Sequence, residues 1–403
     1  MKDAYLIDAV RTPIGKFGGM LSSIRADNLT ALTIKEIVKR NPTLDVNEID
    51  DVIFGCANQA GEDNRNVARM ALLLAGLPFT IPGITVNRLC ASGMSAAVSA
   101  ANSIKADEGE LFITGGMEHM TRGPLVQSKA EFAYSGKVNI YDSTFGWRFV
   151  NPEMEKLFGT EGMGETAENI VEKFNISRED QDLFAYNSQM KAAEARRNGR
   201  FAKEIFPVEI PQRKSKSIIF EDDEFIKEST TTEILSKLRP AFRKDGSVTA
   251  GNSSGINDGA CAMIIASESA AMKFSLKPRV KIIASTVVGV EPRIMGIGPV
   301  YAVKKLLKKV GMTLNQIDII ELNEAFASQS LACIRELGLD DNDERINPNG
   351  GAIALGHPLG MSGARIMQTA MIELEEQQKE FAICTLCVGV GQGMAVLLQN
   401  VNL

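Results

Sequence analysis

Residues 347–363 read N-P-N-G-G-A-I-A-L-G-H-P-L-G-M-S-G and contain His357, one of only two histidines in the chain. Five glycines and two prolines surround this histidine. Glycine is placed where the backbone takes unusual dihedral angles or closely approaches another group, and proline fixes φ. Because imidazole titrates near neutral pH, a histidine held in such a frame is a candidate acid or base. The stretch is equally compatible with an ordinary loop histidine, so the rest of the sequence has to decide.

Composition indicates a globular protein of more than one domain. The chain has 403 residues, of which 44% are hydrophobic and 23% charged. At roughly 150 residues per domain, this length suggests two or three domains. The net charge of −6 argues against a general nucleic-acid-binding surface, although a local cluster of Lys and Arg could bind a polyanionic ligand.

Targeting and cysteine signals indicate a cytoplasmic location. Asp3 and Asp8 interrupt the N-terminal apolar residues, so no signal peptide is expected. No stretch approaches the roughly 20 apolar residues that span a bilayer. Six cysteines are too few for a disulfide framework, and the single C-x-x-C of Cys384 and Cys387 lacks the further ligands of a metal site. We therefore predict reduced thiols, no metal, and neither membrane nor nucleic acid as a partner.

Short apolar stretches alternate with helical patterns at both ends of the chain. In the first part we expect strands at 4–10, 51–56, 84–89 and 110–115, with helices at 28–40, 67–75 and 90–106. Such alternation predicts an α/β protein with a mainly parallel sheet and helices on both faces. The alternation stops between about 121 and 245, where charge clusters predict an inserted domain that lies on the surface.

The C-terminal part repeats the N-terminal part. Its stretches at 280–290, 317–326, 359–364 and 380–387 correspond in order and spacing to those at 4–10, 49–58, 89–94 and 110–117. We therefore expect two similar halves: residues 1–121, completed by about 246–275, and residues 276–403, with residues 122–245 inserted. In this comparison Gly360 takes the place of Cys90, so the two turns would face each other across a pseudo-twofold axis.

Four side chains are candidates for chemistry. Cys90, in L-C-A-S-G-M, lies where a strand leads into a helix, and the helix dipole there favours a nucleophilic thiolate, although a small core cysteine is the commoner case. Cys387 precedes the glycines of C-V-G-V-G-Q-G, whereas Cys384 is expected in the core. Asn323, in E-L-N-E-A-F, is either a helix cap or the holder of a catalytic water. His119 is expected to be structural. Cys90, Cys387 and Asn323 therefore make a candidate site together with His357. The chain contains neither of the two standard glycine-rich loops that bind nucleotides.

Together these motifs resemble the thiolase family along essentially the whole chain, including T-A-G-N-S-S-G-I-N-D-G at 249–259. The resemblance implies a thiolase-like fold, with duplicated mixed-sheet α/β halves in a layered arrangement and an inserted loop domain. It implies that Cys90 is the acylated nucleophile, His357 its base, and Cys387 the second acid and base. Asn323 would hold a water that forms one oxyanion hole with His357, and the backbone N–H groups of Cys90 and Gly389 would form another.

The implied reaction is CoA-dependent cleavage of a 3-ketoacyl-CoA, or the reverse Claisen condensation, by a ping-pong scheme. CoA or acetyl-CoA is then a co-substrate, and no permanently bound cofactor is needed. The resemblance also implies a CoA site: Ser254 and Ala250 would contact the pantetheine arm, Phe242 and Met163 would line its tunnel, Ala325 and Phe326 would flank the thiol end, and Lys227 would meet the nucleotide end.

The substrate is indicated by two local features. Short-chain acetyl-CoA acetyltransferases usually carry a histidine where this chain has Gly162, and D-S-T-F-G-W-R-F-V-N-P at 142–152 looks most like thiolases that cleave 3-oxoadipyl-CoA in aromatic degradation. That substrate ends in a carboxylate, for which Arg148 is a candidate partner unless it simply holds a loop. Family members are dimers or tetramers, and residues 122–149 are long enough for a tetramer-forming loop, so we predict a homotetramer.

Other functions stay open at this point. Within the family, the alternatives are an acetoacetyl-CoA thiolase and a general fatty-acid 3-ketoacyl-CoA thiolase. A decarboxylating condensing enzyme would use a second histidine where this chain has Asn323. A non-catalytic protein that binds acyl-CoA would be expected to lack Cys90, His357 or Cys387, and all three are present.

Overall fold

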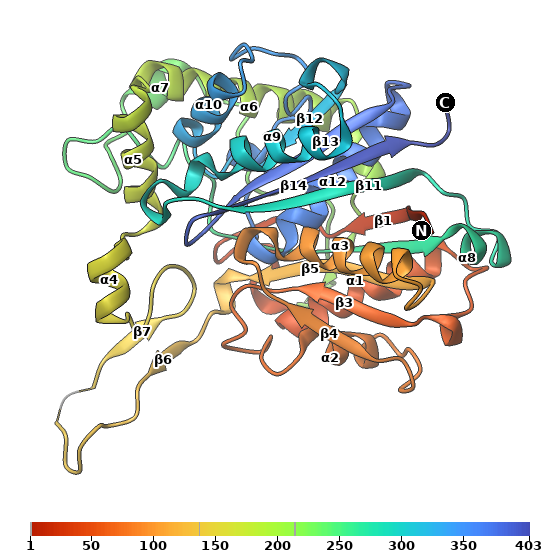
Figure 1. Cartoon of the computed structure of the whole chain (residues 1–403). Helices are drawn as coiled ribbons and strands as arrows, with labels where there is room; N and C mark the ends of the chain where they lie inside the picture. Colours follow the sequence, from red (N-terminus) through yellow and green to blue (C-terminus); the bar gives the residue numbers. More distant parts are fainter. Residues whose placement is uncertain (1, 137, 213–214) are drawn as a thin grey trace.

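The computed structural model describes residues 2–136, 138–212 and 215–403 (Figure 1). The first half alternates strands with helices, as the apolar pattern predicts. Its strands are β1 (Ala4–Arg11), β2 (Gly15–Lys16), β3 (Asp51–Gly55), β4 (Gly83–Val86), β5 (Leu111–His119) and β10 (Asn257–Ser267). Its helices are α1 (Ala26–Arg40), α2 (Val67–Leu74), α3 (Ser92–Lys105) and α8 (Glu268–Lys273).

The second half repeats this order in outline, although no described strand takes the place of β4. The pairing of its strands repeats as well, because β12 to β13 is parallel like β3 to β5, and β13 to β14 is antiparallel like β5 to β10. Its strands are β11 (Val280–Gly289), β12 (Ile319–Leu322), β13 (Phe381–Val388) and β14 (Gln392–Asn400). Its helices are α9 (Gly298–Val310), α10 (Ala327–Glu336), α11 (Ala352–Leu355) and α12 (Leu359–Glu376).

The strands form one 10-stranded sheet in the order β12-β13-β14-β11-β1-β10-β5-β3-β4, with β2 paired to β10. The halves meet at β1 and β11, where only Tyr5 with Lys281 and Leu6 with Val280 are in register. The expectation of a mainly parallel sheet is wrong. The pairings β3–β4, β3–β5 and β12–β13 are parallel, but the other six are antiparallel. One reason is visible at β13 and β14, because residues 389–391 between them are too few for a parallel crossover.

Helices α3 and α12 lie side by side between the two parts of the sheet, as Figure 1 shows. Helices α1 and α2 cover the outer face of the first half, and α9 and α10 cover that of the second. Every residue of α12 from Gly360 to Leu374 is buried, which is the property of a helix enclosed on all sides. Glycines permit the close packing, since a Cβ on Gly93 would lie 2.7 Å from the carbonyl oxygen of Gly360.

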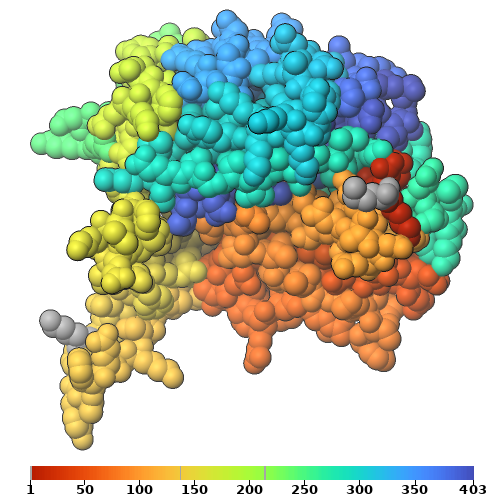
Figure 2. All heavy atoms as spheres, in the orientation of Figure 1, coloured from red at the N-terminus to blue at the C-terminus, as the bar shows by residue number. Residues whose placement is uncertain are grey.

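The segment between β5 and β10 packs partly into this layered body, since Ala192, Phe201 and Ile205 belong to the central core. Its first part, with β6 (Leu125–Gln127) and β7 (Ile140–Asp142), projects away from the rest of the protein (Figure 2). Residues 137 and 213–214 of the predicted inserted domain, and residue 1 of the predicted first half, lie outside the described residues, and the predicted domain limits stay predictions. Among the described helices, none is both long and apolar enough to cross a membrane. The remaining elements are α4 (Pro152–Phe158), α5 (Met163–Phe174), α6 (Arg178–Arg197), β8 (Val208–Ile210), β9 (Ile218–Phe220) and α7 (Thr232–Ser236).

Candidate active site

Cys90 lies in a 3-10 turn, Leu89–Ala91, directly before α3. The helix was expected to begin at Cys90 itself, and it begins at Ser92. Leu89 has φ of 45°, a left-handed conformation that residues other than glycine seldom adopt. Such strain is commonly found at functional sites, where the surrounding packing enforces it. The turn holds Cys90 at the edge of a cavity with only 7% of its surface exposed.

Two backbone donors converge on the Cys90 sulfur. The backbone N–H groups of Gly389 and of Cys90 itself lie close enough to the thiol to lower its pKa. Gly389 belongs to the turn between β13 and β14, and a Cβ there would lie 2.9 Å from Leu89 Cδ1. The next residue, Val390, has φ of 61°, which is strained for a β-branched side chain. An oxygen bound next to this sulfur would find both N–H groups within reach, as an oxyanion hole requires.

Burial decides the charge state of the candidate nucleophile and base. Desolvation raises the pKa of Cys90 to about 11, against the two N–H groups that lower it. Burial, assisted by the positive charge of Arg365, lowers the pKa of His357 to about 3. Both groups are therefore neutral at pH 7. The expectation that the helix dipole favours a resting thiolate is not met, because the cost of burying the charge outweighs the backbone donors.

The hydrogen bonds of His357 assign its tautomer. Its Nδ1 lies 2.6 Å from the hydroxyl oxygen of Ser362, and that hydroxyl donates to the carbonyl oxygen of Pro358 at 2.9 Å. Ser362 must therefore accept from Nδ1–H, which leaves Nε2 as a proton acceptor. Nε2 faces Nδ2 of Asn323 at 3.4 Å. Sequence reasoning missed Ser362, although its place near the start of the helix after His357 made contact possible.

Asn323 and Glu324 follow β12 and have separate roles. Asn323 is fully buried, and its Oδ1 has no hydrogen-bond partner among the described residues. It is not a helix cap, because α10 begins at Ala327 with Phe326 at the N-cap position. An acceptor with no partner beside His357 suits a bound water or substrate. Glu324 instead accepts hydrogen bonds from the side chains of Ser188 and Asn347, and so ties α6 to the His357 stretch.

Cys387 is fully buried in a small apolar cluster with three of the predicted CoA-site residues, Met163, Ala325 and Phe326. Burial raises its pKa well above the usual value, and the proximity of Cys90 adds to this shift. Cys384 packs in the central core, so the two cysteines face opposite sides of β13, as their spacing predicts. The turn that carries Cys90 contacts both β13 and α12, which brings the two cysteines and the His357 region together.

The other predicted CoA-site residues lie nearby or on the surface. The ring of Phe242 packs edge-on against that of Phe326, with 6.1 Å between centroids. The backbone N–H of Ser254 donates to the carbonyl oxygen of Ala325 at 3.0 Å. Ala250 and Lys227 are exposed, and the ammonium group of Lys227 lies over a neighbouring aromatic ring.

A cavity of about 210 Å³ opens onto Cys90. One wall is the continuous segment 143–148, which includes Trp147 and Arg148, so Arg148 does lie where a substrate could reach it. The cavity also contacts Leu89, Gly389 and Val390. The remaining lining residues are Ala57, Asn58, Glu118, Met163 and Leu359.

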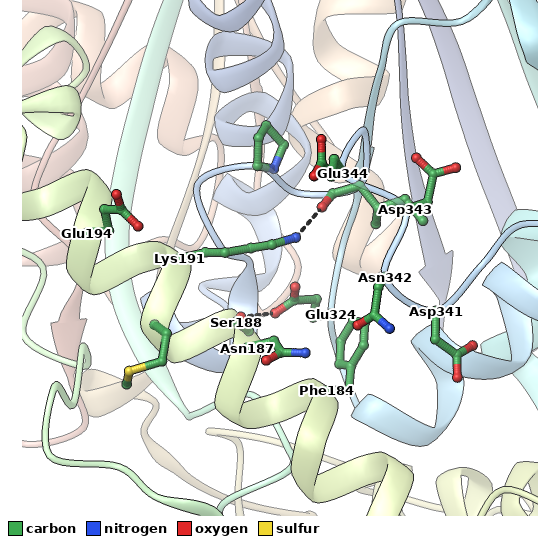
Figure 3. Close-up of a pocket in the computed structure, with 13 residues that line it drawn as sticks. Phe184, Asn187, Ser188, Lys191, Glu194, Glu324, Asp341, Asn342, Asp343 and Glu344 are labelled. Carbon is green, nitrogen blue, oxygen red and sulfur yellow. Dashed lines mark hydrogen bonds between the residues drawn. The ribbon is translucent and has the colours of Figure 1, made fainter.

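Two other features do not take part in this site. A second cavity, of about 480 Å³, lies between α6 and residues 341–348 (Figure 3). It is lined by acidic side chains and by Lys191, whose Nζ donates to the carbonyl oxygen of Ile346 at 2.9 Å. None of the predicted site residues lines it. His119 is structural as expected, with Nε2 3.2 Å from the carbonyl oxygen of Leu21 and Nδ1 3.3 Å from Asp258.

Cys56, Asp63 and Glu118 form a buried group whose possible ligand atoms lie within 4.8 Å of one another. Burial raises the pKa of the Cys56 thiol well above its usual value, which keeps it protonated. Both carboxylates already accept hydrogen bonds from backbone N–H groups. Asp63 accepts from Gly61, and Glu118 accepts from Ala57, Asn58 and Gly360. The group is therefore part of the framework under the Cys90 cavity.

Sequence comparison agrees with this architecture. The family model for the thiolase N-terminal domain matches residues 4–269, and that for the thiolase C-terminal domain matches residues 276–400. The chain is 56% identical to a beta-ketoadipyl-CoA thiolase of Acinetobacter baylyi over 401 residues, covering 100% of both chains. It is 54% identical to the 3-oxoadipyl-CoA/3-oxo-5,6-dehydrosuberyl-CoA thiolase of Escherichia coli, again over 100% of both chains.

Solved structures show the same fold. The acetyl-CoA acetyltransferase of Bacillus anthracis superposes with a TM-score of 0.93 at 40% identity, covering 100% of this chain and 99% of that one. Human mitochondrial 3-ketoacyl-CoA thiolase gives a TM-score of 0.92 at 38% identity, covering 99% of each chain. The chain belongs to the thiolase family and is an acyltransferase whose substrates are CoA thioesters.

Proposed function

We propose that this thiolase cleaves 3-oxoadipyl-CoA with CoA to give succinyl-CoA and acetyl-CoA. The observation that carries the substrate is full-length identity of 53–56% to proteins named beta-ketoadipyl-CoA thiolase. The Cys90 cavity supports it, because it has a volume of about 210 Å³ and its lining includes the cation Arg148. A substrate with a short acyl part that ends in a carboxylate fits such a cavity.

In the first half-reaction Cys90 attacks the ketone carbon, C3, of the substrate. As the C–S bond forms, the thiol proton passes to Nε2 of His357, which its tautomer leaves free to accept it. The N–H groups of Cys90 and Gly389 hold the resulting oxyanion. Both groups are neutral before substrate binds, so no ion pair has to exist in the free enzyme.

The adduct then breaks between C2 and C3. The bonding electrons move into the acetyl-CoA enolate, whose oxygen is stabilised by His357 and by a water held on Asn323. The thiol of Cys387 gives its proton to C2, which releases acetyl-CoA and leaves a succinyl thioester on Cys90. The apolar surroundings of Cys387 favour the protonated thiol that this step needs.

CoA completes the cycle. Its thiol gives a proton to the Cys387 thiolate and attacks the acyl carbon, and the Cys90 thiolate then leaves and recovers its proton from His357. The products are succinyl-CoA and the starting enzyme, so this scheme is ping-pong and requires no permanently bound cofactor or metal. The CoA chain would run past Met163, Phe242, Phe326 and the Ser254–Ala250 segment, with Lys227 near its phosphates.

We also propose a homotetramer formed through residues 122–149. The described part of this segment projects from the body and exposes large apolar side chains, among them Leu125, Phe132, Tyr134 and Ile140. Apolar surface of this kind is characteristic of an interface. A cytoplasmic location is proposed because all six cysteines are free thiols.

The test is product analysis with purified enzyme. Incubation with 3-oxoadipyl-CoA and CoA should yield equal amounts of succinyl-CoA and acetyl-CoA, measured by chromatography and mass spectrometry. The kcat/KM for this substrate should exceed those for acetoacetyl-CoA and for 3-oxohexanoyl-CoA, which has the same chain length without the charge. An enzyme that favours either neutral substrate contradicts the proposed substrate but leaves the thiolase mechanism intact.

A further inference from the structure

Arg148 is a partly buried cation that makes no ion pair with any described residue. Two other partly buried arginines are paired with carboxylates, Arg122 with Glu62 and Arg243 with Glu165. Burying a charge is costly unless an opposite charge or several hydrogen bonds compensate it. The unpaired guanidinium lines the cavity that opens onto Cys90, so an anion within that cavity would compensate it.

Asn58 fixes one edge of this guanidinium. Nη2 of Arg148 donates to Oδ1 of Asn58 at 3.0 Å and to its carbonyl oxygen at 3.3 Å. Nε and Nη1 of Arg148 have no acceptor among the described residues, which leaves three donor hydrogens for a ligand. Asn58 is itself held, because its backbone N–H donates to Oε1 of Glu118 at 3.1 Å. Asn58 is thus held in place by Glu118, and it in turn holds the guanidinium of Arg148.

Glu118 and Ser143, two other polar residues of the cavity, cannot take this role. Glu118 is the other charged residue in the lining, and both of its oxygens accept backbone hydrogen bonds, including one from Gly360 at 2.9 Å. Ser143 donates its hydroxyl to the carbonyl oxygen of Pro124. Among the described lining residues, Arg148 is therefore the one that offers unused charged donors to an anion.

We propose that Asn58 and Arg148 form a subsite for the terminal carboxylate of the acyl group, with Asn58 as the positioning residue. This inference rests on the proposed function. The carboxylate would accept hydrogen bonds from Nε and Nη1 of Arg148, while Asn58 keeps Nη2 and the plane of the guanidinium in place. Charge-assisted hydrogen bonds of this type are about twice as strong as neutral ones, so the subsite selects dicarboxylic 3-ketoacyl groups.

The experiment compares selectivity, the ratio of kcat/KM for 3-oxoadipyl-CoA to that for 3-oxohexanoyl-CoA. Arg148→Met should lower this ratio about ten- to a hundredfold, with most of the loss in KM for the charged substrate. Asn58→Asp keeps Arg148 but places a carboxylate beside it, which should pair with the guanidinium and compete with the substrate. We expect the same direction of change in the ratio, with a larger loss of kcat/KM for the charged substrate than for the neutral one.

Arg40→Met is the matched control, because it removes the same charge from an exposed position on α1. It should leave the ratio unchanged. If wild-type enzyme prefers 3-oxoadipyl-CoA but both cavity variants lose activity equally on the two substrates, the residues only hold a loop and the subsite is overturned. If wild-type enzyme shows no such preference, the proposed substrate itself is wrong, and the subsite fails with it.

Discussion

The turns before α3 and α12 occupy equivalent places in the two halves and have different roles in the proposed mechanism. In the first turn Cys90 lies near Cys387, and backbone N–H groups surround its sulfur. In the second turn the equivalent of Cys90 is Gly360, and a Cβ there would lie 2.2 Å from the carbonyl oxygen of Met117, the residue that corresponds to Cys387. One turn thus leaves space at a reactive side chain, and the other fills the same space with backbone.

This difference shows how a duplicated fold can make one asymmetric site. The second turn carries no nucleophile, but its close packing fixes the backbone from which His357 projects. Glu118, from the first half, accepts a hydrogen bond from the N–H of Gly360 and so joins the two turns. In the proposed mechanism the first turn supplies the reacting atom, and the second supplies a base whose position depends on tight packing.

The comparison predicts its largest effect at Cys90. Cys90→Ala should lower the rate of acetoacetyl-CoA thiolysis on the order of 10⁴-fold or more, because covalent catalysis is lost with the nucleophile. Intact mass spectrometry after incubation with a 3-ketoacyl-CoA, without added CoA, should detect an acyl group on wild-type enzyme and none on the variant.

Cys384→Ala is the control for Cys90, since it removes a buried cysteine from the other face of β13. It should keep both the activity and the acyl group. Residual thiolysis in Cys90→Ala close to the wild-type rate would remove the first turn from the mechanism altogether.

Gly360→Ala tests the second turn through stability. The added methyl group meets backbone rather than a flexible side chain, so the helix has to shift. We expect a loss of about 1 to 3 kcal/mol in the free energy of unfolding, measured by denaturant titration. Gly289→Ala, where the nearest atom lies 4.0 Å from the added one, should have little effect. Equal stability of the two variants would show that the second turn is not tightly packed.

Ser362→Ala tests how the second turn orients its base. Loss of the acceptor for Nδ1–H of His357 should lower kcat about tenfold, because the productive tautomer is no longer enforced. The unfolding free energy should change little by comparison. Ser330→Ala is matched to it, since that hydroxyl is also buried but has no hydrogen-bond partner among the described residues. A kcat that falls equally in both variants would argue against a specific role for Ser362.

The duplication and the candidate residues could be predicted from the sequence, because both depend on local patterns. Glycine-rich turns and strand-to-helix junctions pointed to Cys90 and His357 before any contact was known. Strand direction was not predictable in the same way, since parallel and antiparallel strands of a buried sheet share one apolar pattern. The protonation of Cys90 was mispredicted because a helix dipole is a local property, whereas desolvation depends on everything packed around the sulfur. Ser362 was missed for a related reason: a hydroxyl becomes significant only when the imidazole lies beside it.

The two turns are also distinguished by the pH dependence of stability. The pKa of His357 is lowered to about 3 in the folded protein, against roughly 6.5 when unfolded, so the unfolded chain binds one more proton between these values. Stability contributed by His357 is therefore lost as pH falls through this window, by at most about 1.4 kcal/mol per pH unit. The raised pKa of Cys90 has the opposite effect, because its contribution to stability is lost as pH rises from about 9 towards 11.

His357→Asn should reduce the decrease in unfolding free energy that occurs as pH falls from about 6 to 4, measured by chemical denaturation. Cys90→Ala should reduce only the decrease in unfolding free energy at alkaline pH. If both variants changed the unfolding free energy in the same pH range, the assignment of these charges to the two turns would be contradicted.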